Sequence, residues 1–71
     1  MPGSVYKIIE IVGTSAKSWE EAAKNAVETA AKTLEDLRVA EVVKQDVVVE
    51  KGKVTAYRVR LTISFKYHAE K

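Results

Sequence analysis

Three cationic side chains recur along one segment of this 71-residue sequence. Arg58, Arg60 and Lys66 share one face of a strand predicted over residues 54–67, because successive strand side chains point to opposite faces. A basic strip of this kind could bind RNA or an anionic cofactor. No aromatic residue shares that face, so the strip lacks the stacking platform of single-stranded nucleic-acid binders. We therefore expect these cations to pair with carboxylates across the sheet or an interface. The candidate partners are Glu10, Glu41, Asp46 and Glu50.

The groups needed for covalent or acid–base catalysis do not come together in the sequence. There is no cysteine, which excludes thiol catalysis, disulfides, zinc fingers and iron–sulfur clusters. The one histidine, His68, lies in the tail of the sequence and belongs to no nucleophile–base–acid set, and we expect no role for it. Residues 13–15, Gly-Thr-Ser, are too short for a phosphate loop and are interpreted as the turn that aims the next segment. We therefore predict that the protein is not an enzyme.

Four segments must position these side chains, in the order β-α-β-β. Residues 5–13 are rich in β-branched side chains between turn residues, which predicts a strand. Residues 18–37 carry apolar side chains every three to four positions, which predicts a helix. Residues 39–50 and 54–67 predict two further strands, and Lys51-Gly52 between them is a hairpin turn signal.

The predicted helix has a defined start. Ser18 is a suitable N-cap, and Glu21 three residues later completes a capping box. Trp19, the only tryptophan, follows the cap directly. We expect Trp19 to pack the helix start against the sheet rather than to bind a ligand.

Two of the predicted strands carry apolar side chains on both faces. On the first, Val5, Ile9 and Ile11 oppose Tyr6, Ile8 and Val12, and on the second, Val43, Val47 and Val49 oppose Val42 and Val48. One helix can cover only one face of a three-stranded sheet. A 20-residue helix also spans only about 30 Å, against roughly 40–46 Å for strands of 12–14 residues. The strands therefore need partner subunits, and we predict a homo-oligomer.

Composition narrows the function classes further. Residues 1–71 are enough for one small domain, and a formal charge of +2 does not favour a dedicated nucleic-acid partner. No apolar run approaches the roughly 18–20 residues of a membrane span, so no membrane partner is expected. The lack of cysteine, together with a start that has no signal-peptide pattern, favours a cytoplasmic location.

Several segments resemble one known family. Residues 5–15, VYKIIEIVGTS, and 18–22, SWEEA, resemble the opening of the dodecins, and residues 31–34 and 52–54 continue the resemblance. It covers nearly the whole chain. It implies an α+β fold in which a three-stranded antiparallel sheet wraps around one helix. It also implies that twelve copies form a hollow sphere.

The resemblance further implies a flavin pocket, which is altered here. The best-known dodecins bind riboflavin or FMN and store it without turning it over. Their pocket positions correspond to Val39, Glu41 and Arg58 of this sequence. Val39 stands in place of the family's stacking tryptophan and Arg58 in place of its glutamine. Because a stacked ring contributes about 1–3 kcal/mol, we expect flavin binding to be weakened.

The Val39-Ala40 and Tyr57-Arg58-Val59 segments are more similar to a non-flavin branch of the dodecins that is described as calcium-binding. Calcium takes six to eight oxygen ligands, and the sequence has no EF-hand loop, so a site would be assembled across a symmetry axis. The candidate metal ligands are Glu10, Glu41 and, less so, Asp46. We expect a small-ligand storage protein that binds calcium or another cation. A flavin-sequestering dodecin and a shell without ligand remain alternatives, as does salt bridging of these carboxylates.

Overall fold

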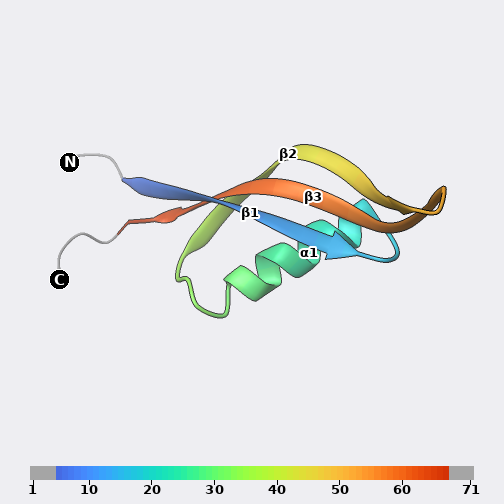
Figure 1. Ribbon diagram of the computed structural model, residues 1–71. Helices are drawn as coiled ribbons and strands as arrows, with labels where there is room; N and C mark the ends of the chain where they lie inside the picture. Colours follow the sequence, from blue (N-terminus) through green and yellow to red (C-terminus); the bar gives the residue numbers. More distant parts are fainter. Residues whose placement is uncertain (1–4, 68–71) are drawn as a thin grey trace.

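A computed structural model describes residues 5–67, and His68 lies outside them. The elements follow the predicted order β-α-β-β: β1 (Tyr6–Ser15), α1 (Trp19–Ala30), β2 (Leu37–Glu50) and β3 (Lys53–Lys66). Both strand pairs are antiparallel, and β3 lies in the centre of the sheet, in the order β1-β3-β2. The helix lies against one face of this sheet (Figure 1). The predicted α+β fold is confirmed.

The core forms where α1 crosses the central strand. Val59, Leu61 and Ile63 are each 1% exposed, as the alternation in the sequence predicts for one face of this strand. Ala22 and Ala26 of α1 complete the buried set. Because alanine is small, the helix axis can approach the sheet closely.

The helix begins as predicted, with one difference in its hydrogen bonds. The Ser18 side chain accepts a hydrogen bond of 3.0 Å from the Glu21 backbone N–H, which confirms the N-cap. The Glu21 carboxylate instead accepts from the Ser15 hydroxyl, at 2.9 Å. The prediction of a turn at residues 13–15 is wrong, because these residues still pair with β3. The end of β1 is thereby tied directly to the first turn of α1.

The predicted end of the helix is also wrong. It ends at Ala30 rather than Leu37, and the next bonds, from the N–H of Lys32 and Thr33, reach back only three residues. This tighter winding ends regular α-helix. Asp36 then takes a positive φ of 60°, and Leu37 begins β2. Leu37, the last apolar residue of the predicted helix, belongs to the strand instead.

A β-bulge changes which way half of β2 faces. Val42 pairs with Leu61 and Lys44 pairs with Arg60, so Val43 is an extra residue in the ladder. An extra residue reverses the alternation beyond it. Val42 and Val47 therefore lie on the same face of the sheet, and the prediction that they oppose each other is wrong.

The strands extend well past the helix, as expected. A helix of 12 residues spans about 18 Å, whereas the molecule measures 55 × 20 × 14 Å. Apolar side chains stay exposed on both strand faces: among them are Ile8, Val12, Val39, Val42 and Val43. No helix within residues 5–67 is long and apolar enough to cross a membrane. The sheet extends past both ends of α1 (Figure 1), and its exposed apolar side chains are not covered by the helix.

Candidate functional site

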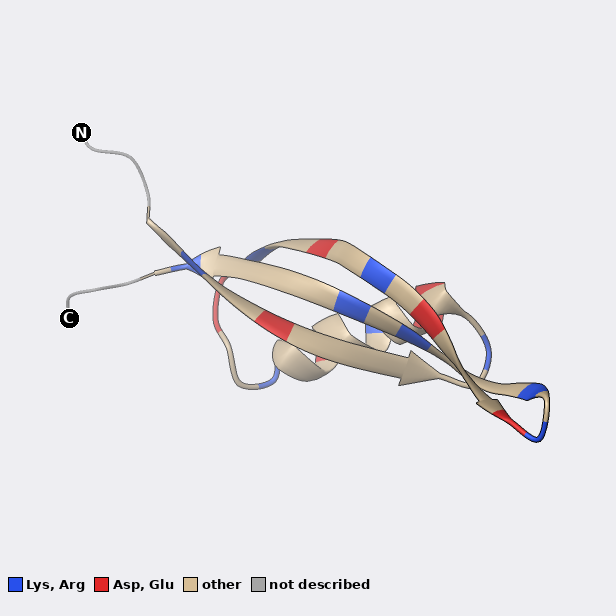
Figure 2. Ribbon diagram, turned by 45° about the horizontal axis from the view of Figure 1, so that its top comes forward, with Lys and Arg blue, Asp and Glu red and all other residues tan. Residues whose placement is uncertain are grey.

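The candidate residues gather on the face of the sheet away from α1, which we call the open face. Since Val59, Leu61 and Ile63 point at the helix, Arg58, Arg60, Thr62 and Ser64 point to the open face. Their partners in register extend this face over β1 and β2 as short rows of side chains. Charged residues of both signs are distributed along the three strands (Figure 2).

One row places two of the predicted metal ligands on either side of a hydroxyl. Glu10 of β1 and Glu41 of β2 both pair with Thr62 of β3. Because neighbouring strands lie about 4.8 Å apart, the two glutamate Cα atoms are separated by roughly 10 Å. Each glutamate side chain reaches over three bonds of about 1.5 Å. Both carboxylates can therefore approach one position near Thr62, and we call these three residues the Glu10–Glu41 row.

Both glutamates in this row are exposed, and neither forms an ion pair with a residue from 5 to 67. Within the same residues, no group of three or more acidic or histidine side chains is placed to hold a metal ion. Calcium takes six to eight oxygens, more than the two carboxylates and the hydroxyl of this row supply. Water or a second subunit must provide the others. One chain thus offers at most part of a candidate cation site.

Asp46, the third predicted ligand, lies apart from this row. It pairs in register with Arg58, four residues along β3 from Thr62, which is about 13 Å. The Arg58 guanidinium donates from Nε and Nη2 to the two Asp46 carboxylate oxygens, at 2.8 and 2.9 Å. This is the strong, bidentate form of an ion pair. It confirms the expectation that Arg58 pairs with a carboxylate across the sheet.

The ion pair also changes the acidity of Asp46. The hydrogen bond from Arg58 lowers the pKa of the Asp46 carboxyl below its ordinary value of 3.8, and the positive charges of Arg58, Arg60 and Lys44 act in the same direction. Asp46 is therefore charged at neutral pH, with both oxygens engaged by Arg58.

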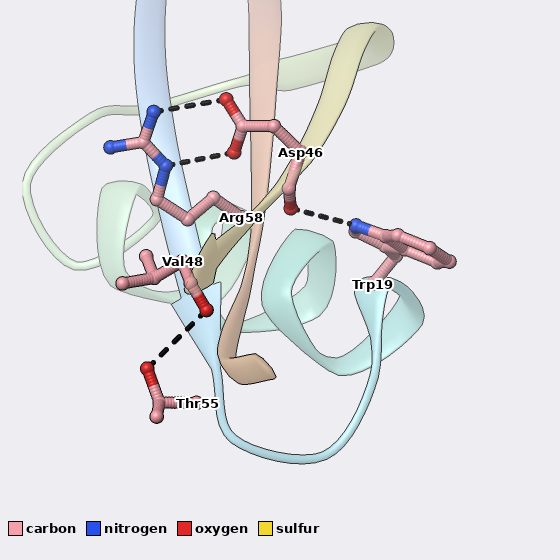
Figure 3. A network of polar contacts seen from close by, with 5 residues as sticks. All are labelled: Trp19, Asp46, Val48, Thr55 and Arg58. Atoms are coloured by element: carbon pink, nitrogen blue, oxygen red, sulfur yellow. Dashed lines mark hydrogen bonds and ion pairs between the residues drawn. The ribbon is translucent and has the colours of Figure 1, made fainter. Parts of the chain in front are cut away.

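Trp19 holds the start of the helix onto this part of the sheet. Its Nε1 donates a hydrogen bond of 3.1 Å to the Asp46 carbonyl oxygen. Its ring meets Tyr57 edge to face, with centroids 5.1 Å apart and planes at 78°. Figure 3 shows Asp46 between Trp19 on one side and Arg58 on the other. The expected packing role of Trp19 is confirmed.

The positions expected to line a flavin pocket do not meet within one chain. Val39 pairs with Ser64 and Arg58 with Asp46, so six residues of β3, about 20 Å, separate them. Glu41 lies between them, in the row of Thr62. The three positions can contribute to a common pocket only if they come from different subunits.

Sequence reasoning did not identify Thr62 or Lys44 as residues of the candidate site. Thr62 could have been found by aligning the strands in register, since both glutamates lie opposite it. Lys44 could not have been found in this way, because simple alternation places it on the face opposite to that of Glu41. Only the bulge at Val43 brings Lys44 to the open face, opposite Arg60.

Comparison with known proteins agrees with this fold. A model of the dodecin family matches residues 5–68. The calcium dodecin of Mycobacterium tuberculosis is 53% identical over 64 residues, which cover 89% of each chain. A crystal structure of that calcium dodecin, described as having a novel calcium-binding site, matches with a TM-score of 0.82 and 48% identity, over 96% of this chain and 97% of that one. A dodecin from Streptomyces coelicolor matches with a TM-score of 0.91 and 33% identity, over 99% and 100% of the two chains.

Proposed function

The chain belongs to the dodecin family, and from this premise we propose that it binds and stores calcium or another cation in a hollow homododecamer. The observation that carries the proposal is the Glu10–Glu41 row, in which Thr62 lies between two exposed carboxylates. The 53% identity to a calcium dodecin supports the choice of cation. The role is binding and buffering in the cytoplasm, without catalysis.

The donor types in the row suit calcium. Calcium prefers hard oxygen ligands and binds carboxylates in mono- or bidentate form. Glu10 lies between Ile9 and Ile11, and Glu41 is followed by Val42. Two like-charged carboxylates on such strands repel each other, and a divalent cation offsets that repulsion. Glu10 and Glu41 would hold the cation, and Thr62 would add one neutral oxygen.

A second copy of the chain would complete the coordination. The row is exposed, and the apolar side chains Ile8 and Val39, in the neighbouring row on the same face, are 64% and 61% exposed. Large apolar side chains left this exposed favour contact with another subunit. An assembly that buries these side chains would also bring carboxylates of different subunits together. The proposed number of subunits, twelve, is the one that the resemblance to the dodecins implies.

The open face gives flavin binding little support. Stacking on a flavin needs an aromatic side chain, and Val39 offers none. Arg58 cannot take the place of a glutamine that both donates and accepts, since guanidinium only donates and two of its nitrogens already bond to Asp46. Flavin storage is therefore not the function we propose.

Thermal unfolding of the assembled protein with calcium, and after removal of calcium by a chelator, tests the proposal. A ligand that binds the folded state raises Tm as its concentration exceeds the Kd. We expect calcium to raise Tm of the unmodified protein and to have a much smaller effect on Glu10→Gln and Glu41→Gln. Glu28→Gln, which removes an exposed carboxylate on α1, is the matched control and should respond like the unmodified protein.

Two outcomes would contradict the proposal: a Tm that does not respond to calcium, or an equal loss of response in Glu28→Gln. Size-exclusion chromatography on the same samples tests the assembly, which should elute at twelve times the 7.9 kDa subunit. Quenching of riboflavin fluorescence at sub-micromolar protein would instead favour a flavin store.

A further inference from the structure

Two cationic side chains face each other directly on the open face. Lys44 of β2 and Arg60 of β3 are partners in register, and both are exposed. Side chains of directly opposed residues lie about 4.5–5.5 Å apart at Cβ, and like charges in such pairs destabilise the sheet. The bulge at Val43 creates this pairing, because it turns Lys44 toward the open face. Bulges recur in proteins where a side chain must be re-aimed.

Asp46 lies one row along the sheet, and besides the hydrogen bond from Arg58 the charges of Arg60 and Lys44 contribute to its lowered pKa. The acidic side chain of the next row, Asp46, has both oxygens bonded to Arg58. Within residues 5–67, neither Lys44 nor Arg60 forms an ion pair. The Asp46 carboxylate is therefore close to three cations, Lys44, Arg58 and Arg60. Only Arg58 forms an ion pair with it. In Figure 2, basic segments lie on the neighbouring strands β2 and β3 at this place.

We propose that Lys44 and Arg60 bind a phosphoryl group, either as inorganic phosphate or on a small phosphomonoester. Arginine presents a planar fork of donors that matches two phosphate oxygens, and lysine adds a point charge. Arg58 and Asp46 compensate each other's charge, so the uncompensated positive charge at this place belongs to Lys44 and Arg60. An anion between Lys44 and Arg60 removes their repulsion. This site is distinct from the Glu10–Glu41 row in residues and in the sign of its ligand.

The surroundings of the pair favour a small anion over a nucleic acid. The third member of the row is Val12 of β1, which is 51% exposed. Arg58 and Asp46 form the row on one side, and the Glu10–Glu41 row lies on the other. None of these rows carries an aromatic side chain on the open face, so bases have nothing to stack on. A nucleic-acid backbone that crossed several rows would also place phosphates against the Glu10 and Glu41 carboxylates, which would repel them.

Isothermal titration calorimetry of the assembled protein with inorganic phosphate tests the site. The buffer is depleted of calcium, and sodium chloride keeps the ionic strength constant. Two charge-assisted contacts on an exposed surface correspond to an apparent Kd of about 1 mM. We expect Arg60→Gln and Lys44→Gln each to weaken binding by about tenfold or more. Lys24→Gln removes an exposed cation from α1 and should stay within about twofold of the unmodified protein.

The outcomes separate this site from the proposed cation site. Glu10→Gln should keep phosphate binding even where it loses the response to calcium. Similar affinity for glycerol 2-phosphate would show that the phosphoryl group alone is recognised, and tighter binding of the ester would show further contacts. Absence of saturable binding in the unmodified protein, or an equal loss in Lys24→Gln or Glu10→Gln, would overturn the inference.

Discussion

Gly13 of β1 lies directly against Ala22 of α1. A Cβ atom added at Gly13 would collide with the Ala22 carbonyl oxygen and would lie 2.8 Å from Ala26 Cβ. The helix backbone occupies the space in which any other side chain would begin. This contact sets how closely α1 approaches the sheet, and with it which strand surface remains free for a partner.

Gly13→Ala should therefore destabilise the protein by about 1–3 kcal/mol, because the helix must move away from a packed core. Urea unfolding at one fixed protein concentration measures the loss. Thr14→Ala is the control, since Thr14 is exposed and points to the opposite face. Equal stability of Gly13→Ala and the unmodified protein would show that the helix can shift without cost.

Trp19→Phe should lower the free energy of unfolding by about 0.5–1.5 kcal/mol, because it removes the hydrogen bond to the Asp46 carbonyl oxygen. It keeps a ring that can contact Tyr57. Trp19→Ala removes both the hydrogen bond and the ring contact and should lower the free energy of unfolding more than Trp19→Phe does. Circular dichroism follows unfolding in all three proteins, since two of them lack tryptophan. If Trp19→Phe is as stable as the unmodified protein, the hydrogen bond adds nothing.

The Asp46–Arg58 ion pair should make stability depend on pH in the acid range. The pKa of Asp46 is lower in the folded protein than its ordinary value of 3.8, chiefly through the hydrogen bond from Arg58. The stabilisation by the ion pair is therefore complete above about pH 4 and is lost as the pH falls through the folded-state pKa. Asp46→Asn should lower Tm at pH 7, and the difference in Tm between the variant and the unmodified protein should shrink as the pH falls toward 2. A difference in Tm that is constant from pH 7 to pH 2 would contradict this assignment.

Removing the repulsion between Lys44 and Arg60 should raise the free energy of unfolding when no phosphate is present. Arg60→Gln in low-salt, phosphate-free buffer should gain about 0.5 kcal/mol or less, because Lys44 no longer faces a like charge. The gain should shrink in 0.5 M sodium chloride, which screens exposed charges. In a protein that already carries Lys44→Gln, Arg60→Gln should not raise the free energy of unfolding. A gain of equal size in that background would show that the two side chains do not interact.

The sequence determines those parts of the fold that depend on local pattern. The alternation around Leu61 predicts the buried face of β3, and Ser18 predicts the helix start. The Lys51-Gly52 turn is also found, with positive φ at both residues, 52° and 77°. Each of these features is set by side chains within a few residues of one another.

Other features depend on contacts between distant segments. The apolar spacing continues past Ala30, but Leu37 pairs with Phe65 of β3 rather than extending the helix. The bulge at Val43 has no local signature in the valine-rich strand, although it decides which face Lys44 occupies. Thr62 becomes part of a candidate site only through its two register partners. A site composed across strands is therefore predictable only when the register is known.

Equilibrium dialysis of the size-fractionated, assembled protein counts the calcium ions bound per subunit. We expect saturable calcium binding in a fixed ratio to subunits, strongly reduced in Glu10→Gln and in Glu41→Gln and unchanged in Glu28→Gln. Calcium that does not exceed the dialysis blank, or binding that survives both substitutions, would contradict a cation site built on the Glu10–Glu41 row.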